Sequence, residues 1–329
     1  SVSEWAYGCL VLPRYEQTAS IFRCGLLGGI AGAIMRLIFV SSEELLLDPF
    51  PFLVEAGVSV AGGVVGGGLT LGGLFLLAPF FDLITTFRLV ELSHPNHPLL
   101  QRLLREAPGT FHHTMMIASM AEQAAERVGA NALLTRAGTY YHDVGKLARP
   151  YFFIENQSGL SNPHDRLDPQ TSADIVIGHV TDGLKLARQY GLPERIRAFI
   201  SEHHGTMRAS FFYRKALNAA GGEAGLVDEA LFRYPGPRPQ SVETALTMLA
   251  DSSEAATRAA RPTSADEIAR VVNNVFEERT HDGQLSECPI TLEDLELVKA
   301  TYVELLRGAY HPRIQYPETK DKTTEEVKA

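Results

Sequence analysis

The chain has 329 residues, of which 45% are hydrophobic and 21% charged, values that fit a folded protein with a sizeable core and more than one structural unit. Its formal net charge of -9 argues against a broadly basic surface, so neither DNA nor RNA is expected as a partner. The three cysteines, Cys9, Cys24 and Cys288, are too few and too scattered for a disulfide framework or a thiolate zinc site, and they favour a reducing compartment.

The first ninety residues are apolar and rich in glycine. They contain two apolar stretches, from about Ala19 to Val40 and from about Phe52 to Phe81, and a membrane span needs about 20 helical residues. The acidic connector 41–48 has no Lys or Arg, whereas basic residues flank the stretches, so the connector should face outward and both ends the cytoplasm. We therefore expect residues 1–90 to form a transmembrane helical hairpin in the lipid bilayer of the inner (plasma) membrane.

The same stretches also fit a buried hairpin of a soluble protein, and Arg36 within the first stretch favours that alternative. Small residues four positions apart, such as Gly28 with Gly32 and Gly62 with Gly66, instead favour close helix packing in lipid. The glycine run 62–73 matches no phosphate-binding motif, so it does not indicate a nucleotide-binding loop.

From the prolines of residues 94–98 to residue 316, the chain is more polar and its apolar residues recur with a helical period. We expect helices here over about 110–128, 132–144, 169–191, 193–204, from 242 past 251, over 265–278 and over 292–306. The Gly- and Pro-rich segment 221–240 is expected to be a long loop, and the polar tail 317–329 to be disordered. The sequence thus predicts an all-α domain over residues 91–316.

Histidines and aspartates lie at the ends or on the faces of these separate helices. The candidates are His113, His142, Asp143, His179, His203, His204 and Asp251. Imidazole nitrogens and carboxylate oxygens are ligands of divalent metals, and this set is large enough for two ions that share a bridging carboxylate. A lone helical histidine is more often a core or surface residue, so the prediction depends on whether the helices converge.

The order of these motifs is specific. It includes Thr110-x-x-His113, His142-Asp143-x-Gly145-Lys146, 203–206 and Asp251, with further matching segments at 106–111, 155–157 and 162–165. Over about Phe87 to Tyr316 the chain resembles the HD-domain metal-dependent phosphohydrolases. It is most similar to their membrane-anchored seven-transmembrane subfamily, whose known activity is cyclic di-AMP phosphodiesterase. The resemblance implies an HD-domain helical bundle, preceded in residues 1–90 by the C-terminal part of a transmembrane bundle.

The resemblance also implies a ligand set for two ions, manganese or iron. One ion would be held by His113, His142, Asp143 and Asp251, and the other by Asp143, His179, His203 and His204. His113 is preferred to His112 because the family motif places its histidine third after the threonine.

The implied reaction is hydrolysis of the 3′-5′ phosphodiester of a cyclic dinucleotide, most directly cyclic di-AMP to linear pApA, by a hydroxide bridging the two ions. Asp143 and Lys146 are the catalytic candidates, and Lys146 is also expected to contact the phosphate. The alternative for Lys146 is an exposed lysine that stabilises a helix end. The other candidate substrate contacts are Asn162, His164, Thr206 and Tyr213, although Tyr213 equally fits an aromatic core cluster.

Two other functions remain open. The domain could hydrolyse another nucleotide, such as cyclic di-GMP, a dNTP or an alarmone, although no Gly-Tyr-Pro follows the aspartate as expected for the cyclic di-GMP branch. It could also be a catalytically inactive, membrane-tethered nucleotide-binding module, although ligands stand at every motif position. A homodimer is left open.

Overall fold

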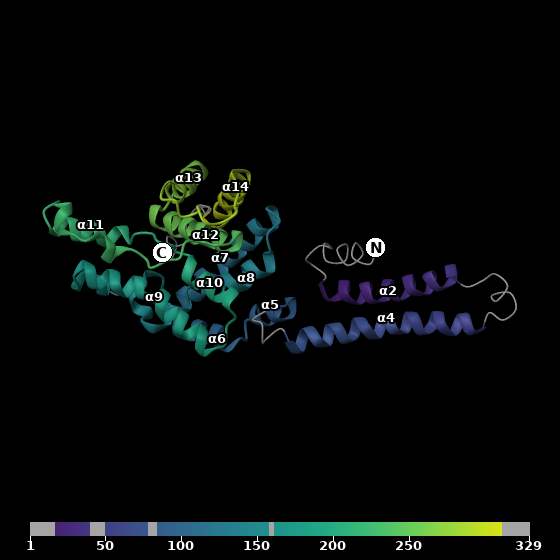
Figure 1. The fold of residues 1–329 in the computed structure, drawn as a ribbon. Coiled ribbons are helices and arrows are strands. Elements are labelled where there is room, and N and C mark those ends of the chain that lie inside the picture. Colours follow the sequence, from purple (N-terminus) through teal and green to yellow (C-terminus); the bar gives the residue numbers. More distant parts are fainter. Residues whose placement is uncertain (1–16, 40–49, 78–83, 158–160, 311–329) are drawn as a thin grey trace, which may run out of the picture.

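The structure, a computed structural model, describes residues 17–39, 50–77, 84–157 and 161–310. These residues form helices and turns, with no β-strand among them; one isolated antiparallel bridge joins Arg208 and Arg233. Figure 1 shows a pair of long helices that projects from a larger helical domain. The predicted all-α class is confirmed. The tail 317–329 lies outside the described residues.

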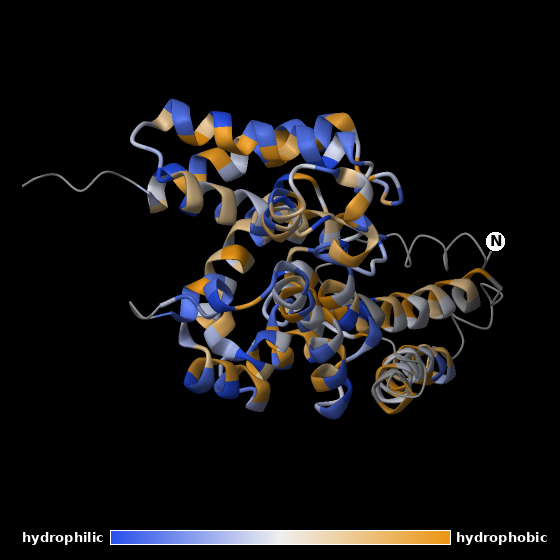
Figure 2. Ribbon diagram, turned by 90° about the vertical axis from the view of Figure 1, so that its left-hand side faces the viewer, coloured by the Kyte–Doolittle hydropathy of each residue, from blue (hydrophilic) through white to orange (hydrophobic). Residues whose placement is uncertain are grey.

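The projecting pair consists of α2 (Gln17–Phe39) and α4 (Phe50–Leu77), which lie side by side. Their backbones approach so closely at Gly25 and Gly63 that a Cβ atom on either glycine would overlap the other's carbonyl oxygen. Most of α4 is exposed and apolar, and Figure 2 shows the pair in orange and white with little blue. Glycine thus permits this close packing.

Of the described helices, one is long and apolar enough to cross a membrane, over Phe50–Gly73. The apolar part of α2 is shorter, over Phe22–Met35, although the sequence suggested two full-length spans. The acidic connector 41–48 lies outside the described residues.

The helical domain is built from ten α-helices within residues 84–157 and 161–310. They are α5 (Thr86–Leu92), α6 (Pro98–Glu106), α7 (Pro108–Arg127), α8 (Ala132–Thr139), α9 (Pro169–Gln189), α10 (Glu194–Glu202), α11 (Ser210–Ala219), α12 (Val242–Ala260), α13 (Ala265–His281) and α14 (Leu292–Ala309). Short 3-10 helices connect them: η3 (Val144–Ala148), η4 (Pro150–Phe152), η5 (Ile154–Asn156), η6 (Pro163–Arg166), η7 (Ala224–Leu226) and η8 (Glu229–Phe232).

Several helix ends follow local sequence signals. The Asp168 side chain accepts a hydrogen bond from the Thr171 N–H, and Pro169 occupies the first turn of α9. Thr291 and Asp294 form a capping box at the start of α14. Gly191, after α9, has a φ of 65°, a left-handed conformation that suits glycine at a helix end.

One expectation about elements was wrong, and one helix was missed. The helix expected over 132–144 ends at Thr139, so His142 and Asp143 follow it in a turn. Helix α11 was not expected. The loop 221–240 contains η7 and η8, which are single turns too short to give a periodic pattern.

Two large hydrophobic cores and two smaller clusters lie in the described part of the domain. One large core is formed mainly by α5, α6, α8 and α10, and the other by α7, α12, α13 and α14. Each contains a fully buried tyrosine whose hydroxyl donates to a main-chain carbonyl: Tyr141 to Leu92, and Tyr302 to Leu246. Helix α7 contributes to both cores, through Ala118 and Ile117, and also carries His113.

Candidate metal centre

The structure brings all seven predicted ligands together in two adjoining groups. The first is His113, His142, Asp143 and Asp251, and the second is His179, His203 and His204. Within each group, one potential ligand atom per residue lies within 4.8 Å of the others. They come from α7, the turn after α8, α9, the end of α10 and α12, so the separate helices do converge.

Asp143 joins the two groups. Its Oδ2 lies 3.2 Å from His142 Nε2, whereas its Oδ1 lies 3.3 Å from His179 Nε2 and 3.7 Å from His203 Nε2. One carboxylate therefore faces both sets of imidazoles with different oxygens, which is the arrangement that a bridging ligand requires.

The turn after α8 depends on a glycine. Helix η3 packs against α9 so closely that a Cβ atom on Gly145 would overlap the main-chain carbonyl of His179 and crowd Gly183 N. This contact sets Asp143 and His179 side by side. The turn replaces the helical geometry that the sequence pattern predicted for His142 and Asp143.

Three histidines are oriented by the main chain. Nδ1 of His142, His179 and His203 lies 2.7, 2.5 and 3.0 Å from the carbonyl oxygens of Thr139, Val176 and Ile200, respectively. A carbonyl can only accept, so Nδ1 carries the proton and donates it. Nε2 of each ring is then left with its lone pair, directed at the centre, as a metal ligand requires.

Burial lowers the pKa of His179, His203 and His204, that of His203 to about 3, so these imidazoles are neutral at pH 7. Burial opposes ionisation of Asp143, but the charge of Lys146 and contacts with His142 outweigh it and hold its pKa well below the usual range. Neutral imidazoles and an ionised carboxylate are the forms that bind a divalent cation.

Several atoms in these groups lack a partner within the described chain. His142 Nε2, His204 Nδ1 and both carboxylate oxygens of Asp143 are buried without a hydrogen bond, although Lys146 forms an ion pair with Asp143. Leaving such atoms unsatisfied costs about 1–3 kcal/mol each. The residues therefore fit divalent ions, which would satisfy these atoms.

Lys146 is largely buried, with 13% of its side chain exposed, so it is not an exposed lysine at a helix end. Its Nζ lies 2.8 Å from Asp143 Oδ2 and 2.8 Å from Glu155 Oε1, and Thr110 Oγ1 donates to the same Glu155 oxygen at 3.1 Å. Burial opposes its charge, but Asp143 and Glu155 outweigh this and raise its pKa above the ordinary value. A charged ammonium group is thus held beside the centre.

The four other candidate substrate contacts are engaged elsewhere. Asn162 accepts from the His164 main-chain N–H, and His164 lies against Phe152 with its Nε2 3.0 Å from that residue's carbonyl oxygen. Thr206 is hydrogen-bonded to the Gln284 side chain, and Tyr213 packs against Phe232. Within the described residues, none of the four forms a hydrogen bond or ring contact with the seven candidate ligands.

The sequence interpretation missed three residues at the centre. Glu254 Oε2 lies 3.0 Å from His113 Nδ1, and the Tyr234 ring lies 4.2 Å from the His204 ring, centroid to centroid. Glu155 belonged to a recognised motif but received no role. Glu254 stands three residues after Asp251, a spacing that places both on one helix face and could have identified it. Tyr234 has no such local signal.

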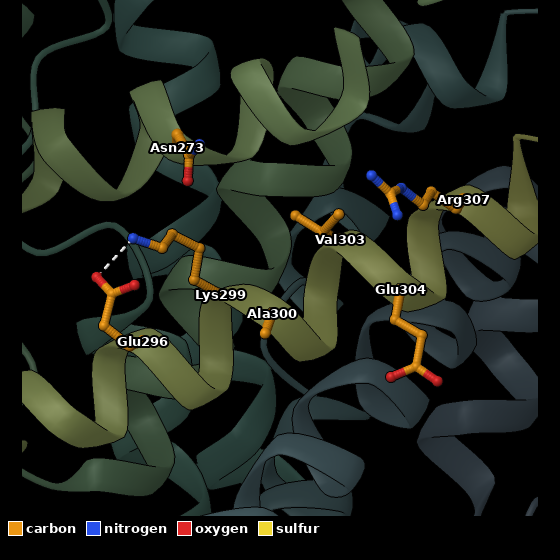
Figure 3. Close-up of a pocket in the computed structure, with 7 residues that line it drawn as sticks. All are labelled: Asn273, Glu296, Lys299, Ala300, Val303, Glu304 and Arg307. Atoms are coloured by element: carbon orange, nitrogen blue, oxygen red, sulfur yellow. Dashed lines mark hydrogen bonds and ion pairs between the residues drawn. The ribbon is translucent and has the colours of Figure 1, made fainter. Parts of the chain in front are cut away.

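A separate groove of 370 Å³ lies between α13 and α14, shown in Figure 3. It is lined by Asn273, Glu296, Lys299, Ala300, Val303, Glu304 and Arg307, and it shares no residue with the two ligand groups. Its two acidic and two basic residues balance, and Lys299 Nζ contacts Glu296 at 2.6 Å. The groove therefore offers no net charge to an anionic ligand.

The helical fold and the paired histidine–aspartate groups define a class of protein. Residues 110–256 match the HD domain family. The chain also matches the crystal structure of the L. monocytogenes phosphodiesterase PgpH HD domain in complex with cyclic-di-AMP. The TM-score is 0.62 at 42% identity, over 67% of this chain and 100% of that one. The chain therefore belongs to the HD-domain family.

Within this family the chain is similar to the cyclic-di-AMP phosphodiesterase PgpH of Bacillus subtilis, at 41% identity over 319 residues. It is also 39% identical over 316 residues to PgpH of Listeria monocytogenes, and 48% identical over 244 residues to the uncharacterized protein slr0104 of Synechocystis. These alignments cover 96%, 96% and 73% of this chain, but only 44%, 44% and 30% of the relatives. The chain thus spans less than half the length of these relatives.

Proposed function

We propose that this chain is the catalytic part of a metal-dependent phosphodiesterase that hydrolyses a 3′-5′ phosphodiester of a cyclic dinucleotide, most directly cyclic di-AMP to linear pApA. The observation that carries the proposal is the position of Asp143, whose two oxygens face two separate groups of ligand side chains. The similarity to an HD domain solved with cyclic-di-AMP supports this substrate class.

In this proposal His113, His142, Asp143 and Asp251 hold one divalent ion. Asp143, His179, His203 and His204 hold a second. Manganese and iron suit this mixture of nitrogen and oxygen ligands. When bound, the two ions would supply a water nucleophile at neutral pH and neutralise charge on the phosphate.

In this proposal the protein itself orients the histidine ligands and offsets the negative charge of the substrate. The main-chain carbonyls behind His142, His179 and His203 keep their Nε2 atoms directed inward. Lys146, held between Asp143 and Glu155, places a cation beside the site of a dianionic cyclic dinucleotide. That cation offsets repulsion from a chain with a net charge of -9. Asn162, His164, Thr206 and Tyr213 remain predictions as contacts for other parts of the substrate.

The proposal includes a membrane location. Helix α4 exposes apolar side chains along its length, such as Leu53, Val58 and Leu69, which suits a lipid environment. We place the hairpin of residues 1–90 in the plasma membrane and the HD domain, 91–316, on the cytoplasmic side, in accord with the distribution of basic residues.

The test uses the whole chain in detergent, stripped of metal and reloaded with Mn²⁺ or Fe²⁺, with cyclic di-AMP, cyclic di-GMP, a dNTP and an alarmone as substrates. We expect linear pApA from cyclic di-AMP, and loss of that product in a His142→Ala/Asp143→Ala variant. Hydrolysis of only another nucleotide would change the substrate assignment. Binding of cyclic di-AMP without turnover in either metal would favour the inactive binding module.

A further inference from the structure

His113 lies between two carboxylates on neighbouring turns of α12. Its Nε2 is 2.9 Å from Asp251 Oδ1, and its Nδ1 is 3.0 Å from Glu254 Oε2. Glu254 is 1% exposed. Because Asp251 belongs to the proposed ligand group, Glu254 lies on the far side of the imidazole from the proposed ion.

Glu254 is itself held in place by Tyr310, the residue that follows α14. The Tyr310 hydroxyl donates to Glu254 Oε1 at 2.7 Å, and the Arg258 guanidinium lies 3.6 Å from Oε2. His113 Nδ1 and Glu254 Oε2 are both buried, and neither forms a hydrogen bond within the described residues, although the two atoms lie 3.0 Å apart as an ion pair. At that distance each atom is available as a partner for the other.

This arrangement differs from that of the other histidines. The orienting carbonyls of His142, His179 and His203 each belong to the residue three positions earlier, so the orientation is set by local backbone. His113 instead faces a carboxylate from a different helix, which Tyr310 holds. A carboxylate behind a metal-bound imidazole strengthens its binding more than a neutral carbonyl does, because it stabilises the positive charge on the ring.

We infer that Glu254, held by Tyr310, is a positioning residue that orients His113 toward a divalent ion and tightens the binding of that ion. The inference rests on the proposed metal centre and adds to it a selective role: of the two proposed ions, only the one that contacts His113 depends on Glu254. It also means that metal binding depends on how α14 packs, because that packing places Tyr310 against Glu254.

The test is a titration of the whole chain in detergent, stripped with a chelator, with Mn²⁺ by calorimetry, and with bound metal counted by mass spectrometry. The variants are Glu254→Gln and Tyr310→Phe. Glu243→Gln is the matched control, because Glu243 is a buried glutamate of the same helix that accepts from the Asn131 N–H. Within the described residues, its hydrogen bonds are to Asn131 and Thr247 and reach neither ligand group.

We expect two ions in the unmodified chain and in the control. In Glu254→Gln, one ion should bind as before and the other about 10- to 100-fold more weakly. Tyr310→Phe should weaken the same ion by a smaller factor, since Glu254 remains. Two unchanged affinities in Glu254→Gln would overturn the inference and leave the proposed function standing, whereas an unmodified chain without bound Mn²⁺ would overturn both.

Circular dichroism of the stripped proteins separates a folding defect from a binding defect. If Glu254→Gln has lost its helical signal, Tyr310→Phe decides the question. Unchanged Mn²⁺ affinities in that folded variant would then overturn the inference, and selective weakening of one ion would support it.

Discussion

The histidines of the two ligand groups differ in their pKa values. His179, His203 and His204 have lowered pKa values, because burial disfavours their charged forms. Burial also disfavours charge on His113, but Asp251 and Glu254 outweigh it and raise its pKa to about 9. A metal ion can therefore bind the three-histidine group without displacing a proton from its imidazoles, but must displace one from His113.

This difference predicts a pH-dependent stability for the metal-free protein. A raised folded-state pKa gives stabilisation that is fully present below the unfolded value of about 6.5 and is lost as the pH rises through about 9. The thermal midpoint of the metal-free protein should fall as the pH rises across this window. Over the same window, the rise in midpoint that Mn²⁺ causes should become larger. A His113→Gln variant should lose both trends, and identical trends in that variant would contradict the assignment.

Gly145 gives a second prediction at the scale of one residue. In Gly145→Ala the added Cβ would overlap the His179 main-chain carbonyl, which cannot move without shifting α9. We expect a loss of about 1–3 kcal/mol in the free energy of unfolding and a loss of metal from the centre, measured by chemical denaturation and metal analysis. Gly225→Ala is the control, because nothing lies near its Cβ position; equal stability of the two variants would argue against the close contact.

At the scale of elements, local sequence signals set where most ligand-carrying helices begin. Burial of its apolar face sets where each helix lies in the domain. Helix α12 illustrates both. Ser241 and Thr244 form a capping box at its start, and Leu246 and Leu249 enter the core. The same helix presents Asp251 and Glu254 to His113. The placement of these carboxylates thus depends on how the apolar face of α12 packs against α7.

The capping box of α14 gives a prediction at this scale. Thr291→Ala removes the oxygen that accepts from the Asp294 N–H at 3.1 Å. The free energy of unfolding should fall by about 1 kcal/mol, while Mn²⁺ affinity should stay unchanged because the helix persists beyond its first turn. Denaturant melts and a metal titration check this. A loss of metal without a loss of stability would show that the start of α14 acts on the centre.

The whole molecule combines an apolar pair of helices with a larger helical domain (Figures 1 and 2). The domain contains both candidate ligand groups. Nothing in the ligand groups comes from the hairpin, so membrane attachment and metal binding should be separable. The connection runs through α5, whose Leu92 carbonyl accepts from Tyr141, the residue beside His142.

If membrane attachment and metal binding are separate, a charge placed in the hairpin should affect only membrane attachment. Leu69 on α4 is 72% exposed, and an arginine there costs about 2.5–3.5 kcal/mol if the helix centre lies in lipid. Leu69→Arg should reduce flotation of the chain with lipid vesicles but leave its Mn²⁺ affinity in detergent unchanged. Leu69→Phe is the apolar control. Equal flotation of both variants would place this face of α4 outside the bilayer.

Much of the centre was predictable from sequence, because its residues belong to ordered motifs. His142-Asp143, the doublet His203-His204 and the capped helices stand out locally, and the all-α class follows from the helical period. The exact end of α8 was not predictable. The apolar pattern continues through Val144, but the contact between Gly145 and α9 favours a turn.

The sequence by itself determined most of the helices and the kinds of ligand, because these depend on residues a few positions apart. Tertiary structure alone decided that Asp143 faces both groups, that Lys146 is enclosed by Glu155, and that Glu254 and Tyr310 lie behind His113. These contacts join residues from 9 to more than 100 positions apart. Their geometry is set by the packing of whole helices, which local periodicity does not encode.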